Sequence, residues 1–529
     1  MPEKYSSVDN IIDTLIGNEH FTPAQMQAWG HTINWMISTL LIDDNPEEKV
    51  DGNFTITYSG PEEVSATADN YRLPSDIAVT MGEDSSTQAN FTWLTKYSVT
   101  ASDIEIVPYS ENPSFGRGAN DGLEIKASSK PETISYPGAD LGIIAFLDFN
   151  KEYTRHTVTV SNLEPGKKYS YRLGDASRGW WSETGTLQTA DGTDKTAFIA
   201  LADMQGQNDT QYGVFSDVLK AAFTTVPDAK FVVSAGSQVT LAKNCKHWKS
   251  FFNTAAGSLM KTFFMPAAGV REKAGGYVTQ YFNLASLPVQ KTDTGVYYSY
   301  DYNNIHFTVL NTNNLSGKEL GEPQLNWLKE DVSSSDADWK VVVLPKAIYS
   351  NGAKATAKEN KNIRAQLSGL LPYLGVDLVL QGQDLVYWRT GALSGGLPAM
   401  SGREKVSYDG ADYTAMVNPQ GTVYALPGTA GVKRVYETNS TATLFPNAEK
   451  SFVPDAPMFA SVKTDGSTLY YDAYKVVDGK AEKADSFAIK KTGSSGAGSF
   501  FNLLASKMDF SFLWSIIGFF VNIFSVFAK

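Results

Sequence analysis

Several apolar runs in the chain stop abruptly at a polar residue and a glycine, and this recurring pattern constrains the fold most strongly. Phe198 to Ala202 is continuously apolar, Asp203 follows it, and Gly206 lies three residues further on. A short, near-continuous apolar run is typical of a strand buried on both faces of a parallel sheet. Ligands of open α/β sheets bind beyond the carboxyl ends of such strands, so Asp203 is a candidate site residue. A helix-capping role for Asp203 is the simpler alternative.

Similar runs recur between residues 195 and 490, and helix-like segments lie between them. The clearer predicted helices are Gln324–Val332 and Lys361–Leu374, which carry apolar residues at helical spacing. This alternation predicts a layered α/β domain over residues 195–490. The further predicted strands are Phe231–Gly236, Thr262–Gly269, Ile305–Asn314, Trp339–Pro345 and Val376–Gly382.

The residues before this domain differ from it in composition and in the spacing of their turns. Residues 53–190 are rich in Thr, Tyr, Val and Ser with turns between short runs, which predicts a β-sandwich. Within it, Thr157–Asp175 is predicted to form two alternating strands around a Pro165-Gly166 turn. Residues 1–50 predict a helical N-terminal segment. The fold class predicted for the whole chain is therefore multidomain α+β.

The C-terminal end predicts a hydrophobic helix. Residues 491–499 form a Gly/Ser linker, and within the tail 500–529 the stretch Phe510–Ala528 carries no charge. Its length is close to the roughly 20 residues that a membrane-spanning helix needs. We therefore expect the membrane to be a partner through 510–528, although folding back onto the protein or assembly in water is an alternative. Small residues at helical spacing in this tail predict a homo-oligomer.

Composition limits the classes of partner and compartment. The 529 residues are too many for one core, and the net charge is −12, from 45 basic and 57 acidic residues. No basic run stands out, which argues against nucleic acid as a partner. The single cysteine, Cys245, excludes an intrachain disulfide framework. Residues 1–20 contain no signal peptide, and we expect a membrane-associated location at the cell surface or outside the cytoplasm.

Taken together, the ordered segments resemble the metallophosphoesterase superfamily, and in particular its purple acid phosphatase-like branch with a fibronectin type III-like domain in front. The resemblance covers about residues 72–490. It rests on five ordered strand-end segments, namely Ala202–Gly206, Ser234–Val239, Ala267–Glu272, Val343–Ser350 and Gln381–Thr390.

The resemblance implies a fold with a two-metal centre that hydrolyses phosphoesters, but the metal-ligand positions are degenerate. Asp203 keeps the first aspartate of the family pattern. The remaining positions, which hold a bridging aspartate, an Asn-His pair and three further histidines in the family, are here Ser237, Val270, Arg271, Pro345, Gln383 and Leu385. The valine, proline and leucine offer no side-chain donor atom to a metal, and the arginine brings a positive charge.

We therefore expect a fold that is kept and a metal centre that is lost. The leading hypothesis is a catalytically inactive pseudophosphatase that acts as a membrane-associated binding or structural module with an unknown protein partner and no cofactor. The alternative is an active phosphoesterase with a reduced or atypical metal site, formed by Asp203, Gln205, Gln383 and Asp384. A third hypothesis is a different enzyme in which Arg271 or Arg389 grips an anion.

One contact is expected at the lost centre. A carboxylate left at a buried strand end without its cation is costly unless it is paired. Arg271 lies on a segment that faces the same cavity in the family, so we expect it to approach Asp203. Asp384 is the other candidate for an ion pair or anion contact.

Overall fold

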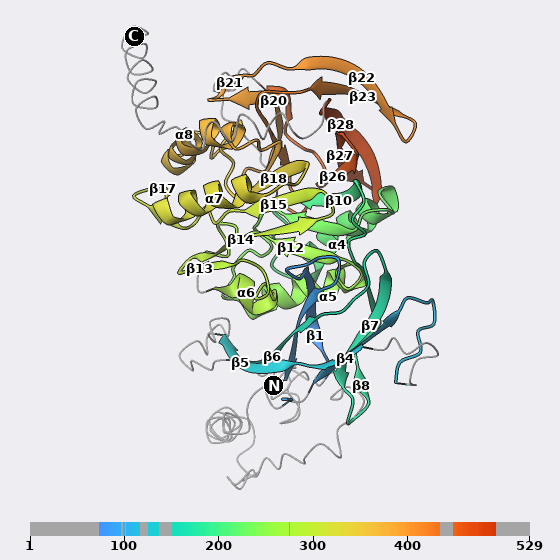
Figure 1. Cartoon of the computed structure of the whole chain (residues 1–529). Helices are drawn as coiled ribbons and strands as arrows, with labels where there is room; N and C mark the ends of the chain where they lie inside the picture. The colour runs from blue at the N-terminus through green and yellow to red at the C-terminus, as the bar shows by residue number, and fades with distance from the viewer. Residues whose placement is uncertain are drawn as a thin grey trace.

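A computed structural model of the chain describes residues 73–96, 99–100, 102–116, 125–136, 151–273, 276–433 and 448–492 (Figure 1). The predicted N-terminal helices, most of the Gly/Ser linker and the apolar tail lie outside the described residues. No described helix is long and apolar enough to cross a bilayer.

The front part of the chain is the predicted β-sandwich. Its core is aromatic and aliphatic, and Phe91 packs edge-to-face on Tyr171, with the ring centroids 5.0 Å apart. One sheet has the order β1-β2-β6-β5 and the other the order β4-β3-β7-β8, with β9 also paired to β7. The strands are β1 (Ser75–Met81), β2 (Ala89–Lys96), β3 (Asp103–Pro108), β4 (Ile125–Ser128), β5 (Lys130–Tyr136), β6 (Lys151–Val160), β7 (Lys168–Asp175), β8 (Trp180–Trp181) and β9 (Gly185–Gln188).

The two strands predicted over Thr157–Asp175 are confirmed as β6 and β7, with the Pro165-Gly166 turn between them. They belong to different sheets and do not pair with each other. Tyr169 and Tyr171 share the buried face of β7, as alternation requires, and they face the core between the sheets. The Pro165-Gly166 turn therefore carries the chain from one layer to the other. Alternation fixes which residues of a strand face inward, but it does not select the neighbouring strand.

Two large mixed sheets form the rest of the molecule (Figure 1). The first has the order β12-β11-β10-β26-β27-β28-β23-β22, and its strands are β10 (Lys195–Leu201), β11 (Phe231–Ser234), β12 (Phe263–Pro266), β22 (Gly402–Tyr408), β23 (Ala411–Val417), β26 (Met458–Asp465), β27 (Thr468–Val477) and β28 (Lys480–Lys490). The second has the order β13-β14-β15-β18-β19-β24-β20-β21, with β25 paired to β20, and its strands are β13 (Gln290–Thr292), β14 (Gly295–Tyr302), β15 (Ile305–Val309), β18 (Trp339–Leu344), β19 (Leu378–Gln381), β20 (Tyr387–Ser394), β21 (Leu397–Pro398), β24 (Thr422–Pro427) and β25 (Ala448–Phe452). A separate two-stranded ribbon joins β16 (Leu315–Ser316) and β17 (Glu319–Leu320).

The apolar runs of the sequence are the parallel centres of these sheets. Strands β10, β11 and β12 are parallel to one another, as are β15, β18, β19 and β24. Their inner faces meet, and Phe198 of β10 packs edge-to-face on Phe307 of β15 with ring centroids 5.2 Å apart. Because strands that run in parallel finish at the same edge, the polar residues that follow them are gathered there.

Helices cover the outer faces. α7 (Glu322–Ser334) and α8 (Lys358–Tyr373) confirm the predicted helices, and Leu328 and Ile363 of these helices share an apolar cluster with Val342 of β18. On the other side, α4 (Asp209–Thr225) and α5 (Cys245–Leu259) stack through Phe215 and Phe251, with centroids 5.0 Å apart. A short helix, α6 (Tyr277–Tyr281), completes the described set.

A buried histidine ties α7 to the second sheet. His306 of β15 lies between two carboxylates, with Nδ1 2.6 Å from Asp301 and Nε2 3.0 Å from Asp331. Asp331 also accepts hydrogen bonds from Ser299 and Thr308. Although burial by itself lowers the pKa of His306, the two carboxylates outweigh it and raise the pKa to about 9. His306 therefore has a structural role.

We predict that His306 makes stability depend on alkaline pH. Its folded pKa lies above the ordinary value of 6.5, so its contribution is fully present below about pH 6.5 and is lost as the pH rises through 9. His306→Asn should lower the free energy of unfolding by on the order of 2 kcal/mol at pH 6 and by much less at pH 10. Denaturant unfolding of both proteins at both pH values measures this, and a difference that is independent of pH would contradict it.

Candidate functional site

The polar residues predicted at the strand ends meet at one edge of the two sheets. Asp203 follows β10, and its backbone N–H donates to the carbonyl of Gly236, which follows β11, over 3.1 Å. Its carboxylate accepts from the backbone N–H of Gln383, which follows β19 in the opposite sheet, over 2.9 Å. The hydroxyl of Thr429, after β24, donates to the Asp203 carbonyl over 2.9 Å. Four strand ends from both sheets therefore converge on Asp203.

Glycines allow this convergence. A Cβ atom on Gly382 would lie 2.4 Å from the carbonyl oxygen of Ala235, and one on Gly269 would lie 2.2 Å from the nitrogen of Ser237. No side chain fits at either distance, so the strand-end loops touch through their backbones.

Three non-glycine residues of the same edge adopt left-handed backbone conformations. The φ angles are 55° at Asp203, 59° at Ser237 and 78° at Gln383. Such angles cost free energy for residues with a Cβ atom, and they are found only where contacts with the surrounding structure hold the backbone in that conformation. Each of the three opens the turn after its strand and brings a polar group toward the others.

Asp203 is buried, with 1% of its surface exposed. Burial raises the pKa of its carboxyl to about 6, although hydrogen bonds from Ser237, Gln383 and Gln205 counteract the rise. The nearby Asp384 adds to the rise through charge repulsion. Asp203 is thus a carboxylate whose ionised form is maintained at neutral pH by donors from three different loops.

Lys433, which the sequence reasoning missed, is linked to this carboxylate through the side chain of Gln205. Its ammonium donates to Oε1 of Gln205 over 2.8 Å, and Nε2 of Gln205 donates to Asp203 over 3.2 Å. Burial and the charge of Arg271 lower the pKa of Lys433, and the charge of Asp203 raises it. Lys433 follows β24, so it reaches the site from the closing region of the fold.

The prediction that Arg271 approaches Asp203 was wrong. Arg271 is exposed, and within the described parts of the chain no carboxylate lies within ion-pair distance of its guanidinium. An exposed guanidinium keeps its hydration, whereas Lys433 is already partly buried beside Gln205. Arg389, the other candidate anion-binding cation, is bound internally, because it forms ion pairs with Asp485 at 2.7 Å and Glu449 at 2.6 Å.

A second buried carboxyl at this edge was also missed. Glu272 is fully buried and accepts from the backbone N–H groups of Ser237, at 3.1 Å, and Val239, at 3.0 Å. Burial is the main cause that raises its pKa, to about 7, and Asp203 contributes by repulsion. Glu272 stands next to Arg271 in the sequence, and nothing local indicates which of the two side chains turns inward.

The other predicted positions are present but make no comparable contacts. Asp384 is buried, accepts from the backbone N–H of Lys354 over 2.9 Å, and has one carboxylate oxygen, Oδ2, without a hydrogen-bond partner. Pro345 is buried, and Val270 and Leu385 are half-buried at the ends of β12 and β19.

The donor set fits a two-metal centre poorly. Such a centre needs a bridging carboxylate together with imidazole and amide donors. The described residues contain no cluster of three or more His, Cys, Asp or Glu side chains suited to a metal ion. The Asp203 and Glu272 carboxylates are engaged by N–H and O–H donors, and a lysine ammonium lies on the Asp203 side. No chemical step is therefore derived through a metal.

Comparison with known proteins agrees with this architecture. The family described as "Purple acid Phosphatase, N-terminal domain" matches residues 74–189, which form the front sandwich. Acid phosphatase type 7 of Mus musculus is 24% identical over 308 residues, which make up 53% of this chain. The match spans 65% of that relative's length.

Among solved structures, purple acid phosphatase PPD1 from yellow lupin (Lupinus luteus) seeds superposes with a TM-score of 0.63 and 17% identity. The superposition covers 80% of this chain and 75% of the lupin chain. At this identity the likeness shows the fold. The front-domain match, the mouse relative and the shared fold thus all show similarity to purple acid phosphatases.

Proposed function

We propose that this chain is a catalytically inactive metallophosphoesterase-like protein, a pseudophosphatase, which acts as a binding or structural module. The observation that carries the proposal is the position of Lys433. Its ammonium is linked through Gln205 to the buried Asp203, the one position at which this chain keeps a metal-ligand aspartate of the family pattern. A fixed positive charge there opposes the binding of a metal ion by repulsion.

The chemistry of the remaining positions supports the same conclusion. Val270, Pro345 and Leu385 supply no donor atom, and Ser237 is a weak neutral ligand that already donates to Asp203. Meanwhile the fold holds its site geometry through backbone contacts and hydrogen bonds. A scaffold that needs no metal for its shape remains available as a binding surface.

Membrane attachment through 510–528 belongs to the same proposal. It rests on the uncharged stretch of the tail and on the Gly/Ser linker before it. The tail and most of the linker lie outside the described residues. A module held at a membrane by such a tail would present the sheets and the sandwich to a protein partner.

The alternative is a phosphoesterase with a reduced metal site. One observation favours it, since Oδ2 of Asp384 is buried without a hydrogen-bond partner and a cation would satisfy it. Against it, Lys433 and Arg271 both bring positive charge to this edge.

We predict that the purified chain contains no stoichiometric transition metal and does not hydrolyse an aryl phosphate. A strong chelator should leave its thermal midpoint unchanged, because hydrogen bonds hold the strand ends together. Elemental analysis, a phosphatase assay and thermal unfolding with and without chelator measure these properties. About one metal ion per chain with turnover would favour the alternative, and about two would overturn the proposal.

We also predict that Lys433 stabilises the ionised Asp203. Because the pKa of Asp203 is about 6, the interaction is present above that pH and is lost as the carboxyl is protonated below it. Lys433→Met should therefore reduce the free energy of unfolding by about 1 kcal/mol at pH 8 and by less at pH 5.

The matched control is Lys480→Met, which removes an exposed ammonium at the start of β28. Denaturant unfolding at both pH values compares the two variants. If Lys433→Met and Lys480→Met change the free energy of unfolding equally at pH 8, Lys433 does not stabilise the ionised Asp203.

A further inference from the structure

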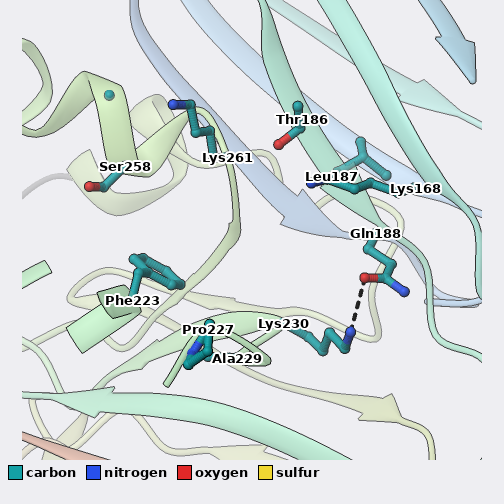
Figure 2. Close-up of a pocket in the computed structure, with 11 residues that line it drawn as sticks. Lys168, Thr186, Leu187, Gln188, Phe223, Pro227, Ala229, Lys230, Ser258 and Lys261 are labelled. Carbon is teal, nitrogen blue, oxygen red and sulfur yellow. Dashed lines mark hydrogen bonds between the residues drawn. The ribbon is translucent and has the colours of Figure 1, made fainter. Parts of the chain in front are cut away.

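A cavity lies between the front sandwich and the helices that cover the first large sheet, and none of the residues that line it belongs to the strand-end site. Its volume is about 360 Å³, within the range of small-molecule sites. Figure 2 shows side chains of β7 and β9 on one side, and on the other side residues of α4 and α5 and of the segments that follow these helices. The cavity therefore has walls from both parts of the protein.

The cavity is basic although the protein as a whole is acidic. Lys168, Lys230 and Lys261 line it, each from a different segment, and none of the lining residues is Asp or Glu. The whole chain, by contrast, has a net charge of −12. Within the described parts of the chain, none of these three ammonium groups has a carboxylate within ion-pair distance. Three positive charges without a counter-charge favour an anionic ligand.

The partners that two of the lysines do have are neutral. The ammonium of Lys168 lies 3.9 Å from the ring centroid of Tyr109. The ammonium of Lys230 donates to Oε1 of Gln188 over 2.9 Å, the bond drawn across the cavity in Figure 2. Neither contact cancels the charge, so both lysines remain available to a phosphate.

Part of the wall is apolar. Leu187 is buried, while Phe223 and Ala229 are half-buried and Pro227 is exposed at the cavity. A small inorganic anion would leave Phe223, Ala229 and Pro227 in contact with water. A ligand that carries a planar or apolar group beside its negative charges would cover them.

The cavity is also preformed. The backbone N–H of Thr186 donates to the carbonyl of Met260 over 2.9 Å, and the hydroxyl of Tyr171 donates to the same carbonyl over 2.9 Å. These bonds fix β9 against the end of α5. The loss of conformational entropy needed to order the walls on ligand binding would therefore be small.

We propose that this interdomain cavity binds a small organic phosphate with a planar group, of the chemical class of a nucleotide. The lysines hold the phosphate groups, and Phe223, Pro227 and Ala229 cover the organic part. Because the walls come from both the sandwich and the α/β layers, binding strengthens the junction between them.

The test uses the full chain with ATP, without added Mg²⁺, and with tripolyphosphate and adenosine as separate probes. Calorimetry should show that ATP binds more tightly than either probe, and ATP should raise the thermal midpoint. The double variant Lys168→Ala/Lys261→Ala should weaken ATP binding by about tenfold or more. Lys220→Ala, which removes an exposed lysine paired with Asp217 on α4, should leave it unchanged.

A second variant blocks the cavity without changing its charge. Gly257 of α5 lines the cavity, and a Cβ atom built there meets no atom within 4 Å, so Gly257→Leu is compatible with the fold. It should abolish ATP binding. Gly213→Leu on α4 is the matched control, because that site is equally open and does not line the cavity.

Three outcomes would overturn the proposal. The first is no measurable binding of ATP. The second is equal binding of ATP by the Gly257→Leu and Gly213→Leu variants, which would place the ligand elsewhere. The third is binding of tripolyphosphate as tight as that of ATP, which would show that the organic group has no site here.

Discussion

The contact between the two large sheets at their strand ends is the constraint on which the rest of the site depends. The carboxylate of Asp203 in one sheet accepts the backbone N–H of Gln383 in the other. That contact requires residues without a Cβ atom where the loops cross, and Gly269 and Gly382 meet this requirement. The contact is made by protein groups alone, and it pairs a buried carboxylate with a backbone N–H group.

The same contact between the sheets also raises the pKa values of the buried carboxyl groups at this edge. Packing the loops this closely buries Asp203 and Glu272 together, and burial raises the pKa of both. A buried carboxylate is tolerated when hydrogen-bond donors or a cation compensate it. Here backbone N–H groups, the Gln205 amide and the Lys433 ammonium do so. The strand ends thus hold a charged cluster in which the Lys433 ammonium is linked to Asp203 through Gln205.

The basic cavity follows from a different feature of the architecture. The front sandwich rests on the first large sheet through β1, which contacts β12 and α5. Where β7 and β9 diverge from the helices, space is left, and lysines from both sides line it. Junctions between domains are common places for ligand sites, because two rigid bodies meet there with imperfect complementarity.

Much of this organisation was encoded locally. Apolar runs predicted β10, β11, β12, β15, β18 and β19, and helical spacing predicted α7 and α8, because periodicity depends only on neighbouring residues. The order of the strand-end segments was enough to recognise the fold. The identities of Val270, Pro345 and Leu385 were enough to show that these three side chains offer no donor atom to a metal.

The tertiary structure decided which of these segments and side chains meet. It separated β6 from β7, turned Glu272 inward and left Arg271 in solvent. It also brought Lys433 to Gln205, although the two are separated by 228 positions. Such contacts depend on how distant strands are ordered in a sheet, and no local pattern carries that information.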